Sequence, residues 1–138
     1  YTESPVQFKM LDNVGDSKDR DFEIFIQDNK IPVPRMYILT PVPGTKMYND
    51  FEAENRIFDY DLAKYNGGKT VFTPRRMDAE TLDKNYWKLY DQIYSYRSIL
   101  KRMGGMPKQS TAHLRAFVFG TNLHYKGHVK QRITPGII

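Results

Sequence analysis

The spacing of apolar residues between positions 78 and 103 constrains the fold more than any other feature of this sequence. These residues alternate at intervals of four and three, as in a heptad seam, which predicts one long helix near 78–103. The seam consists of Leu82, Tyr86, Leu89, Ile93, Tyr96, Leu100 and Met103. Asp78 stands at the expected N-cap, and Gly104-Gly105 provides the stop signal.

Aromatic residues widen this seam to one side, so we expect the helix to pack against more than one neighbour. They are Trp87, Tyr90 and Tyr94. Together with Tyr86 and Tyr96 they form a stripe that would also suit stacking on nucleic-acid bases. Helical spacing favours a place in the protein core over such a platform.

The first part of the chain predicts a short βαβ-like segment. Residues 6–11 have strand-like composition, and a helix capped by Asp16 or Ser17 is expected to run to about Asn29. The prolines at positions 32 and 34 require extended backbone. Residues 35–39 then have the composition of a short buried strand.

Shorter elements are predicted on both sides of the long helix. Thr45 is expected to cap a helix that runs to about residue 55, and residues 69–72 to form a short strand. A last helix at about 110–125 should have an apolar face formed by Leu114, Phe117 and Val118. Gly127 and Pro135-Gly136 are expected to break the structure that follows. The prediction is an α+β fold, mainly helical, with a βαβ-like N-terminal segment.

No cysteine occurs among the 138 residues. The chain therefore contains no disulfide, no thiolate zinc ligand, no thiol nucleophile and no cysteine ligand for an iron–sulfur cluster. It also lacks a P-loop, a nucleophile elbow and a dinucleotide fingerprint. No apolar run approaches the roughly 20 residues of a membrane span, and no signal peptide is recognisable, so we expect a cytoplasmic protein.

Charge is distributed unevenly along the chain. The net charge is +5, yet the first 91 residues carry 13 basic and 16 acidic residues, and no carboxylate follows Asp91. Such an asymmetry indicates either a solvated basic face or a surface that meets an anionic partner. The candidate contacts to RNA or to an anionic membrane surface are Arg115, Lys126, Lys130 and Arg132.

Other polar clusters have weaker links to chemistry. His124 and His128 have the spacing of two metal ligands on one helical face, but no third ligand is evident, and surface histidines are the plainer interpretation. Asp59 and Asp61 would suit an acid/base pair in a small enzyme, although nothing in the sequence raises a pKa there. Acidic residues at positions 12, 16, 19 and 21 lack the glycine and the closing Glu of a calcium loop, which favours capping.

Four blocks of sequence resemble cobalamin-binding radical SAM proteins. Residues 22–32 followed by 35–45, which include LTPVPGT, are similar to the end of their catalytic barrel. Residues 71–77, 86–90 and 94–100 resemble the uncharacterised helical C-terminal domain of that family. The ending, residues 122–125 with 135–138, is similar to the tail of the same proteins.

This resemblance implies that the chain is the C-terminal region of a longer enzyme. The parent would have a cobalamin-binding domain and a radical SAM barrel, whose C-x3-C-x2-C loop holds a four-iron four-sulfur cluster that cleaves S-adenosylmethionine. Because this chain has no cysteine, no catalytic residue, cofactor-binding residue or metal ligand is carried over. The chain is expected to be non-catalytic by itself, in a parent of the Fe–S oxidoreductase or methyltransferase type. It would cap the barrel or shape the substrate site.

The resemblance also predicts the organisation of the chain and its partners. Residues 1–45 would be the end of the barrel and residues 46–138 a helical C-terminal domain, in one compact unit. The turn that matches the family, formed by Thr40, Pro41, Pro43, Gly44 and Thr45, would border a pocket. The main partner would be the rest of the parent polypeptide. A fragment with unpaired strand edges is expected to form a homodimer or to repack its strands under the long helix.

Overall fold

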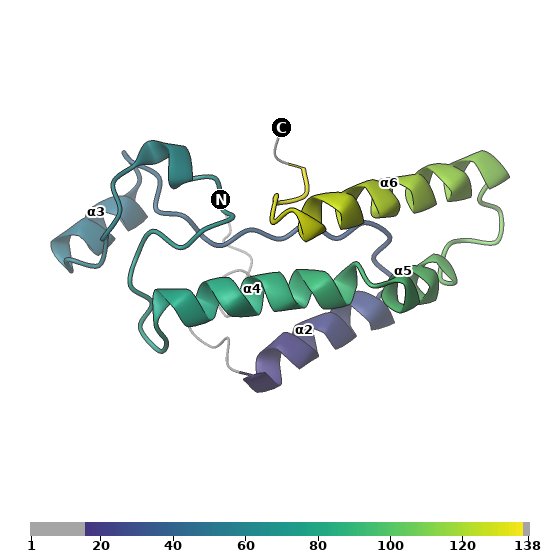
Figure 1. Cartoon of the computed structure of the whole chain (residues 1–138), viewed down its shortest axis with the longest axis horizontal. Coiled ribbons are helices and arrows are strands. Elements are labelled where there is room, and N and C mark those ends of the chain that lie inside the picture. Colours follow the sequence, from purple (N-terminus) through teal and green to yellow (C-terminus); the bar gives the residue numbers. More distant parts are fainter. Residues whose placement is uncertain (1–15, 137–138) are drawn as a thin grey trace. The chain divides into compact units, whose positions relative to one another are not determined.

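The computed structural model describes the backbone of residues 16–136 and the side chains of residues 22–136 (Figure 1). Within this range the elements are α2 (Asp16–Asp28), α3 (Lys46–Ala53), the 3-10 helix η1 (Leu62–Lys64), α4 (Ala79–Ile93), α5 (Tyr96–Met103) and α6 (Ala112–Lys130). The prediction of a mainly helical chain is confirmed. The described residues divide into two compact units, one of residues 37–86 and one of residues 16–36 with 87–136.

The 37–86 unit surrounds a small apolar core. The buried side chains of this core are Ile38, Ile57, Val71, Phe72, Leu82 and Tyr86. Asp83 of α4 fixes the neighbouring loop, because its Oδ1 accepts hydrogen bonds from the Thr70 backbone N at 2.9 Å and the Thr70 hydroxyl at 2.6 Å. These two bonds give partners to the backbone N–H and the hydroxyl of Thr70, which is itself buried.

The two predicted strands that lie within the described residues are wrong. Residues 69–72 take part only in an isolated antiparallel bridge between Ile57 and Phe72. Residues 35–39 are extended but pair with no strand, and the Ile38 N–H donates instead to the carbonyl of Gly67 at 2.7 Å. The βαβ-like segment is therefore not seen, and its first strand, predicted at 6–11, lies outside the described residues.

Tyrosine hydroxyl groups take the place of a neighbouring strand beside the extended segment. The Tyr90 hydroxyl donates to the Met36 carbonyl at 2.7 Å and accepts from the Met36 N–H at 2.9 Å. The Tyr94 hydroxyl donates to the Pro34 carbonyl at 2.6 Å. Composition predicted correctly that Met36 is buried, but the partner of its main chain is a side chain and not a β-ladder.

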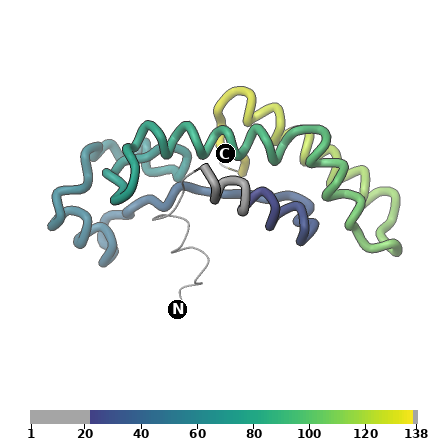
Figure 2. Tube along the Cα trace, turned by 90° about the horizontal axis from the view of Figure 1, so that it is seen from below, coloured from purple at the N-terminus to yellow at the C-terminus, as the bar shows by residue number. Residues whose placement is uncertain are grey.

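The single helix predicted near 78–103 is two helices. α4 ends at Ile93 and α5 begins at Tyr96, and the trace changes direction between the two helices (Figure 2). The Ser95 side chain accepts from the Ser98 N–H as the N-cap of α5. Two non-helical residues at the junction shift the register of the buried face, so Ile99 is buried while Tyr96 and Leu100 are 60% and 62% exposed. The apolar seam therefore ends at Ile93. Serine at an N-cap competes with helix continuation, which explains the break.

α6 is longer than predicted and buries a different face. Thr111 caps it by accepting from the Leu114 N–H, and it continues through Gly127 to Lys130. Its buried residues are Val118, Asn122 and Val129. Leu114 and Phe117, which were predicted to belong to the apolar face with Val118, are 46% and 72% exposed. Among residues 16–136, no helix is long and apolar enough to cross a membrane.

Candidate functional site

A groove of about 540 Å³ runs along one side of α6 and is the candidate site of this chain. Its lining residues all belong to the 16–36 and 87–136 unit. They are Arg35, Phe117, Gly120, Thr121, His124, Tyr125, His128 and Gly136. Most of them recur at intervals of three or four on α6, so they share one helical face. The groove is open and largely apolar, with cationic and imidazole groups on it.

The position of α6 is fixed by a buried polar network around Arg102 of α5. The Arg102 Nη1 donates to the Ile93 carbonyl at 2.6 Å and to the Ser98 hydroxyl at 2.7 Å. Its Nη2 donates to the Asn122 Oδ1 at 2.8 Å. The Asn122 Nδ2 in turn donates to the Pro32 carbonyl at 3.0 Å. One guanidinium and one amide thus connect the end of α4, α5, α6 and the loop that follows α2.

Arg102 is a fully buried cation whose hydrogen bonds, among the side chains described from residue 22 to residue 136, go to neutral oxygens. It is 0% exposed, and it forms no ion pair with those side chains. Burial lowers the pKa of its guanidinium below the usual value, and the nearby Tyr94 opposes this change. The Nε atom has no hydrogen-bond partner in the described structure. An arginine nevertheless stays protonated, so the network has to hold a positive charge inside the protein.

The two histidines predicted as a weak metal site do lie together on the groove. Their ring centroids are 4.3 Å apart. The Nδ1 of His128 is buried and makes no hydrogen bond in the described structure. No group of three or more potential ligands occurs among the described residues, so the pair has no third ligand there. The geometry makes these histidines part of the groove wall.

Three of the four basic residues predicted to contact an anionic surface have partners inside the chain. Arg115 donates to the Pro107 carbonyl at 3.0 Å. Lys126 donates to the Tyr94 carbonyl at 3.0 Å and lies over the Tyr96 ring. Arg132 pairs with Asp91 at 3.0 Å and lies over Trp87. Lys130 is exposed and has no such partner among the side chains of residues 22–136.

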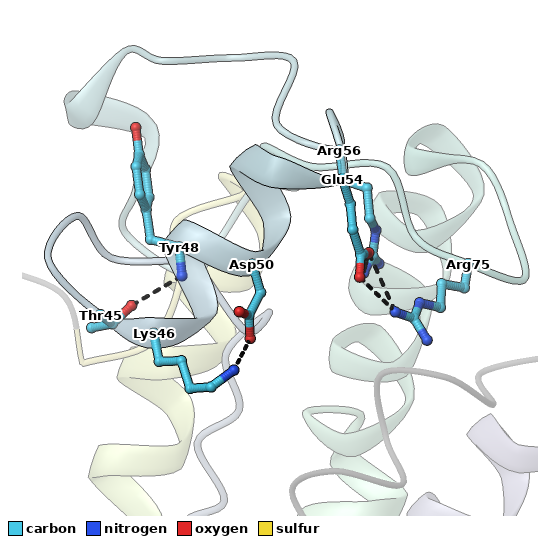
Figure 3. A network of polar contacts seen from close by, with 7 residues as sticks. All are labelled: Thr45, Lys46, Tyr48, Asp50, Glu54, Arg56 and Arg75. Atoms are coloured by element: carbon cyan, nitrogen blue, oxygen red, sulfur yellow. Dashed lines mark hydrogen bonds and ion pairs between the residues drawn. The ribbon is translucent and has the colours of Figure 1, made fainter.

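The predicted pocket turn at residues 40–45 lies in the 37–86 unit, immediately before α3 (Figure 3). The Thr45 side chain accepts from the Tyr48 N–H at 3.2 Å, which confirms Thr45 as the N-cap. Gly44 adopts φ +86°, a conformation that favours glycine. The Thr40 hydroxyl donates to the Ile38 carbonyl at 3.1 Å. Pro41 is buried and Pro43 is exposed. These contacts explain the turn as a structural element, and its role beside a pocket stays a prediction.

An ion-pair network follows the same helix (Figure 3). Glu54 accepts from Arg75 Nη2 at 3.0 Å and from Arg56 Nη1 at 3.2 Å. The hydrogen bond from Arg75 is the main reason why the pKa of the Glu54 carboxyl lies below its ordinary value. The Arg56 guanidinium also lies 4.1 Å from the centroid of the Phe51 ring. Glu54 and Arg75 are exposed and Arg56 is half-buried, and together these groups hold the end of α3 in place.

The remaining candidates from the sequence have structural roles. Asp59 accepts from Lys64 Nζ at 2.7 Å, and this bond is the main reason for the lowered pKa of Asp59. Asp61 caps η1. A carboxyl with a lowered pKa is a poor general acid, so Asp59 is not tuned for that role. The aromatic stripe is mostly core, since Tyr86, Tyr90 and Tyr94 are all buried. The acidic positions 12 to 21 have no described side chains.

Sequence reasoning missed the two features that define the site. The spacing of apolar residues does not reveal that Arg102 is buried, because the heptad seam predicts that Leu100 and Met103 form the buried face there. The signal that could have revealed it is Ser95, a strong N-cap residue that shifts the register by breaking the helix. The exposure of Phe117 was also missed. The sequence predicted Phe117 and Val118 on one apolar face, but only Val118 is buried.

Comparison with known proteins gives one family match. The family described as "Domain of unknown function (DUF4070)" matches residues 45–119, which is more than half of the chain. No solved structure gives a significant match.

Two curated proteins of Chlorobaculum tepidum are similar to this chain. Bacteriochlorophyllide d C-12(1)-methyltransferase is 35% identical over 105 residues, which cover 74% of this chain and 23% of that protein. Bacteriochlorophyllide d C-8(2)-methyltransferase is 28% identical over 99 residues, which cover 72% of this chain and 22% of that protein. The match therefore spans less than a quarter of each relative. Both names agree with the methyltransferase type that the sequence resemblance implied.

Proposed function

We propose that this chain, which belongs to the DUF4070 family, is the C-terminal part of a cobalamin-binding radical SAM methyltransferase and helps to form its substrate site. The observation that carries the proposal is the similarity to two methyltransferases along 74% and 72% of this chain. Because the match spans less than a quarter of each relative, the catalytic groups of such an enzyme would lie in the remaining polypeptide.

The residues of this chain do not fit an iron–sulfur cluster. It has no cysteine, and the described residues include no group of three or more His, Asp or Glu that could bind a metal. In the parent, the cluster, S-adenosylmethionine and cobalamin would supply the radical and methyl-transfer chemistry. The contribution proposed for this chain is to cover the catalytic domain and exclude water from the substrate.

The polar core supports such a positioning role. The network of Arg102 and Asn122 fixes four segments relative to one another within one unit. A cap that has to exclude water needs a defined surface, and a buried polar network restricts the alternative packings of a helical core.

The experiment is a comparison of two activities of the whole parent enzyme, purified without oxygen. Wild type is compared with a variant that carries Asn122→Leu, and iron and cobalt contents are measured for both. We expect metal contents and S-adenosylmethionine cleavage to be retained and methylation of the substrate to fall at least about tenfold. Equal methylation by a variant whose chain is destabilised would contradict the proposed role in the substrate site. Absence of iron and cobalt from the wild-type parent would contradict the enzyme class.

The alternative, a module that binds RNA or an anionic membrane surface, has less support. It depends on Arg115, Lys126, Lys130 and Arg132, and three of these already bind oxygen atoms inside the chain. Affinity from phosphate contacts depends on cations that are free to replace counterions. The structure offers fewer free cations there than the sequence led us to expect.

A further inference from the structure

α6 exposes more large apolar side chains than is usual for a helix surface that faces solvent. Of its 19 residues, Val118, Asn122 and Val129 are buried. Phe117 is 72% exposed, Leu114 46% and Leu123 36%. Apolar residues on several sides of a helix are typical of a helix that is covered on several sides. One of these sides is the groove.

The middle of the groove is hollow because Gly120 has no side chain. A Cβ placed on Gly120 would have no atom within 4 Å. A glycine inside a helix lowers the stability of the helix relative to alanine. No close contact within this unit requires a glycine at position 120. Phe117 lies about one turn before this hollow and His124 about one turn after it. The three positions form a shallow seat for an apolar side chain.

The charge beside the seat is positive. Arg35 lines the groove, is exposed, and has no hydrogen bond or ion pair through its side chain with the described residues. No carboxylate occurs in the sequence after Asp91, so α6 itself provides no counterion. A partner that fits this surface presents an apolar side chain to the hollow and a carboxylate to Arg35.

We infer that the groove on α6 is the surface on which the preceding part of the same polypeptide docks, through an apolar residue seated at Gly120 and an Asp or Glu paired with Arg35. This inference rests on the proposed function, since that makes the chain part of a longer enzyme. More than three quarters of each similar methyltransferase lies outside the matched region, which gives an occupant of sufficient size. The openness of the groove suits a protein segment better than an enclosed small molecule.

α6 provides a matched pair of variants for the test. Gly120 and Gly127 are both inside the helix, and a Cβ at either has no atom within 4 Å. Gly120 lines the groove and Gly127 does not. Gly120→Leu and Gly127→Leu therefore make the same chemical change, and only the first fills the seat.

The experiment uses the full-length parent with the photoreactive residue benzoylphenylalanine in place of Phe117, and cross-linked peptides are identified by mass spectrometry. We expect a cross-link to a peptide that precedes this chain. Gly120→Leu should lower its yield about tenfold, because the added side chain occupies the seat. Gly127→Leu should leave the yield unchanged. The same probe in place of Leu100, which is 62% exposed on α5, controls for exposure alone and should give no such cross-link.

The outcomes separate the two proposals. A cross-link to a second copy, to another part of this chain, or no cross-link at all in a parent that methylates its substrate overturns the docking surface and leaves the proposed function intact. Equal losses from both glycine variants overturn the seat at Gly120. A correct cross-link in a parent that contains no iron or cobalt supports docking and contradicts the proposed enzyme class.

Discussion

Replacement of Asn122 by leucine tests the buried network most directly. Leucine has a similar size, so the substitution changes hydrogen bonding more than volume. It removes the bond from Arg102 Nη2 to Oδ1 and the bond from Nδ2 to the Pro32 carbonyl. The bond from Nδ2 to the Val118 carbonyl matters less, since that carbonyl lies inside a helix.

The expected loss of folding stability follows from the buried polar groups that lose their partners. Arg102 remains charged and buried, and its Nη2 joins Nε as a donor without a partner. A lost partner of a buried charged group costs about 3 kcal/mol, within the range of about 3–5 kcal/mol for breaking a buried ion pair. The melting temperature should fall by roughly 10 °C, at about 2–4 °C or somewhat more per kcal/mol for a domain of this size.

The assay is reversible unfolding in guanidinium chloride, followed by circular dichroism. Thr121→Leu, at a half-buried position next to Asn122 and outside the Arg102 network, is the control and should change stability by less than about 0.5 kcal/mol. The double variant Arg102→Met, Asn122→Leu should be more stable than Asn122→Leu alone, because it removes the unpaired charge. A loss below about 1 kcal/mol for Asn122→Leu, or additive losses in the double variant, would refute the argument that the network compensates a buried cation.

Further predictions concern single features. Gly127→Ala should stabilise the chain by up to about 1 kcal/mol in the same unfolding assay, because helix propensity improves and the added Cβ meets no atom within 4 Å; a loss would contradict the open surface. Titration by NMR should give Glu54 a pKa below 4.5, and Arg75→Gln should raise it; the stability that Glu54 contributes is then present above its unfolded pKa and lost as pH falls through the folded value. The chain should bind RNA or anionic vesicles only weakly, with a Kd of about 10⁻⁴ M or weaker at physiological salt, and Lys130→Gln should not change this affinity. Tight binding that Lys130→Gln abolishes would favour the alternative function. The sequence left open a homodimer or a chain that repacks its strands under the long helix; a compact monomer in light scattering would contradict the homodimer.

Local signals in the sequence predicted α2, α3 and the start of α4 well. Thr45 is the N-cap of α3, and α2 ends at Asp28 close to the expected Asn29. These features depend on residues within one or two turns, so spacing and capping chemistry determine them. The prediction of a core role for Tyr90 and Tyr94 was confirmed for the same reason.

Features that depend on distant partners were not predictable in this way. Residues 35–39 have strand-like composition, but a strand needs a neighbouring strand, and the Tyr90 hydroxyl binds both main-chain groups of Met36 across 54 positions of sequence. The groove was missed for a similar reason. Its wall depends on which side of α6 is buried, and that side is selected by the bond between Asn122 and Arg102 on another helix.

The polar core and the apolar surface of this unit are therefore linked. An apolar helix usually turns its largest side chains inward, yet α6 buries Asn122 and exposes Phe117. Rotation of α6 by about one residue position, roughly 100°, would bury Phe117 at the cost of leaving Arg102 without the Asn122 oxygen. The cost of about 3 kcal/mol for removing this partner from a buried cation is at least as large as the roughly 1.5–3 kcal/mol gained by burying one large apolar side chain. The network consequently keeps Phe117 and the hollow at Gly120 available to a partner, which makes the buried arginine a positioning residue for the groove.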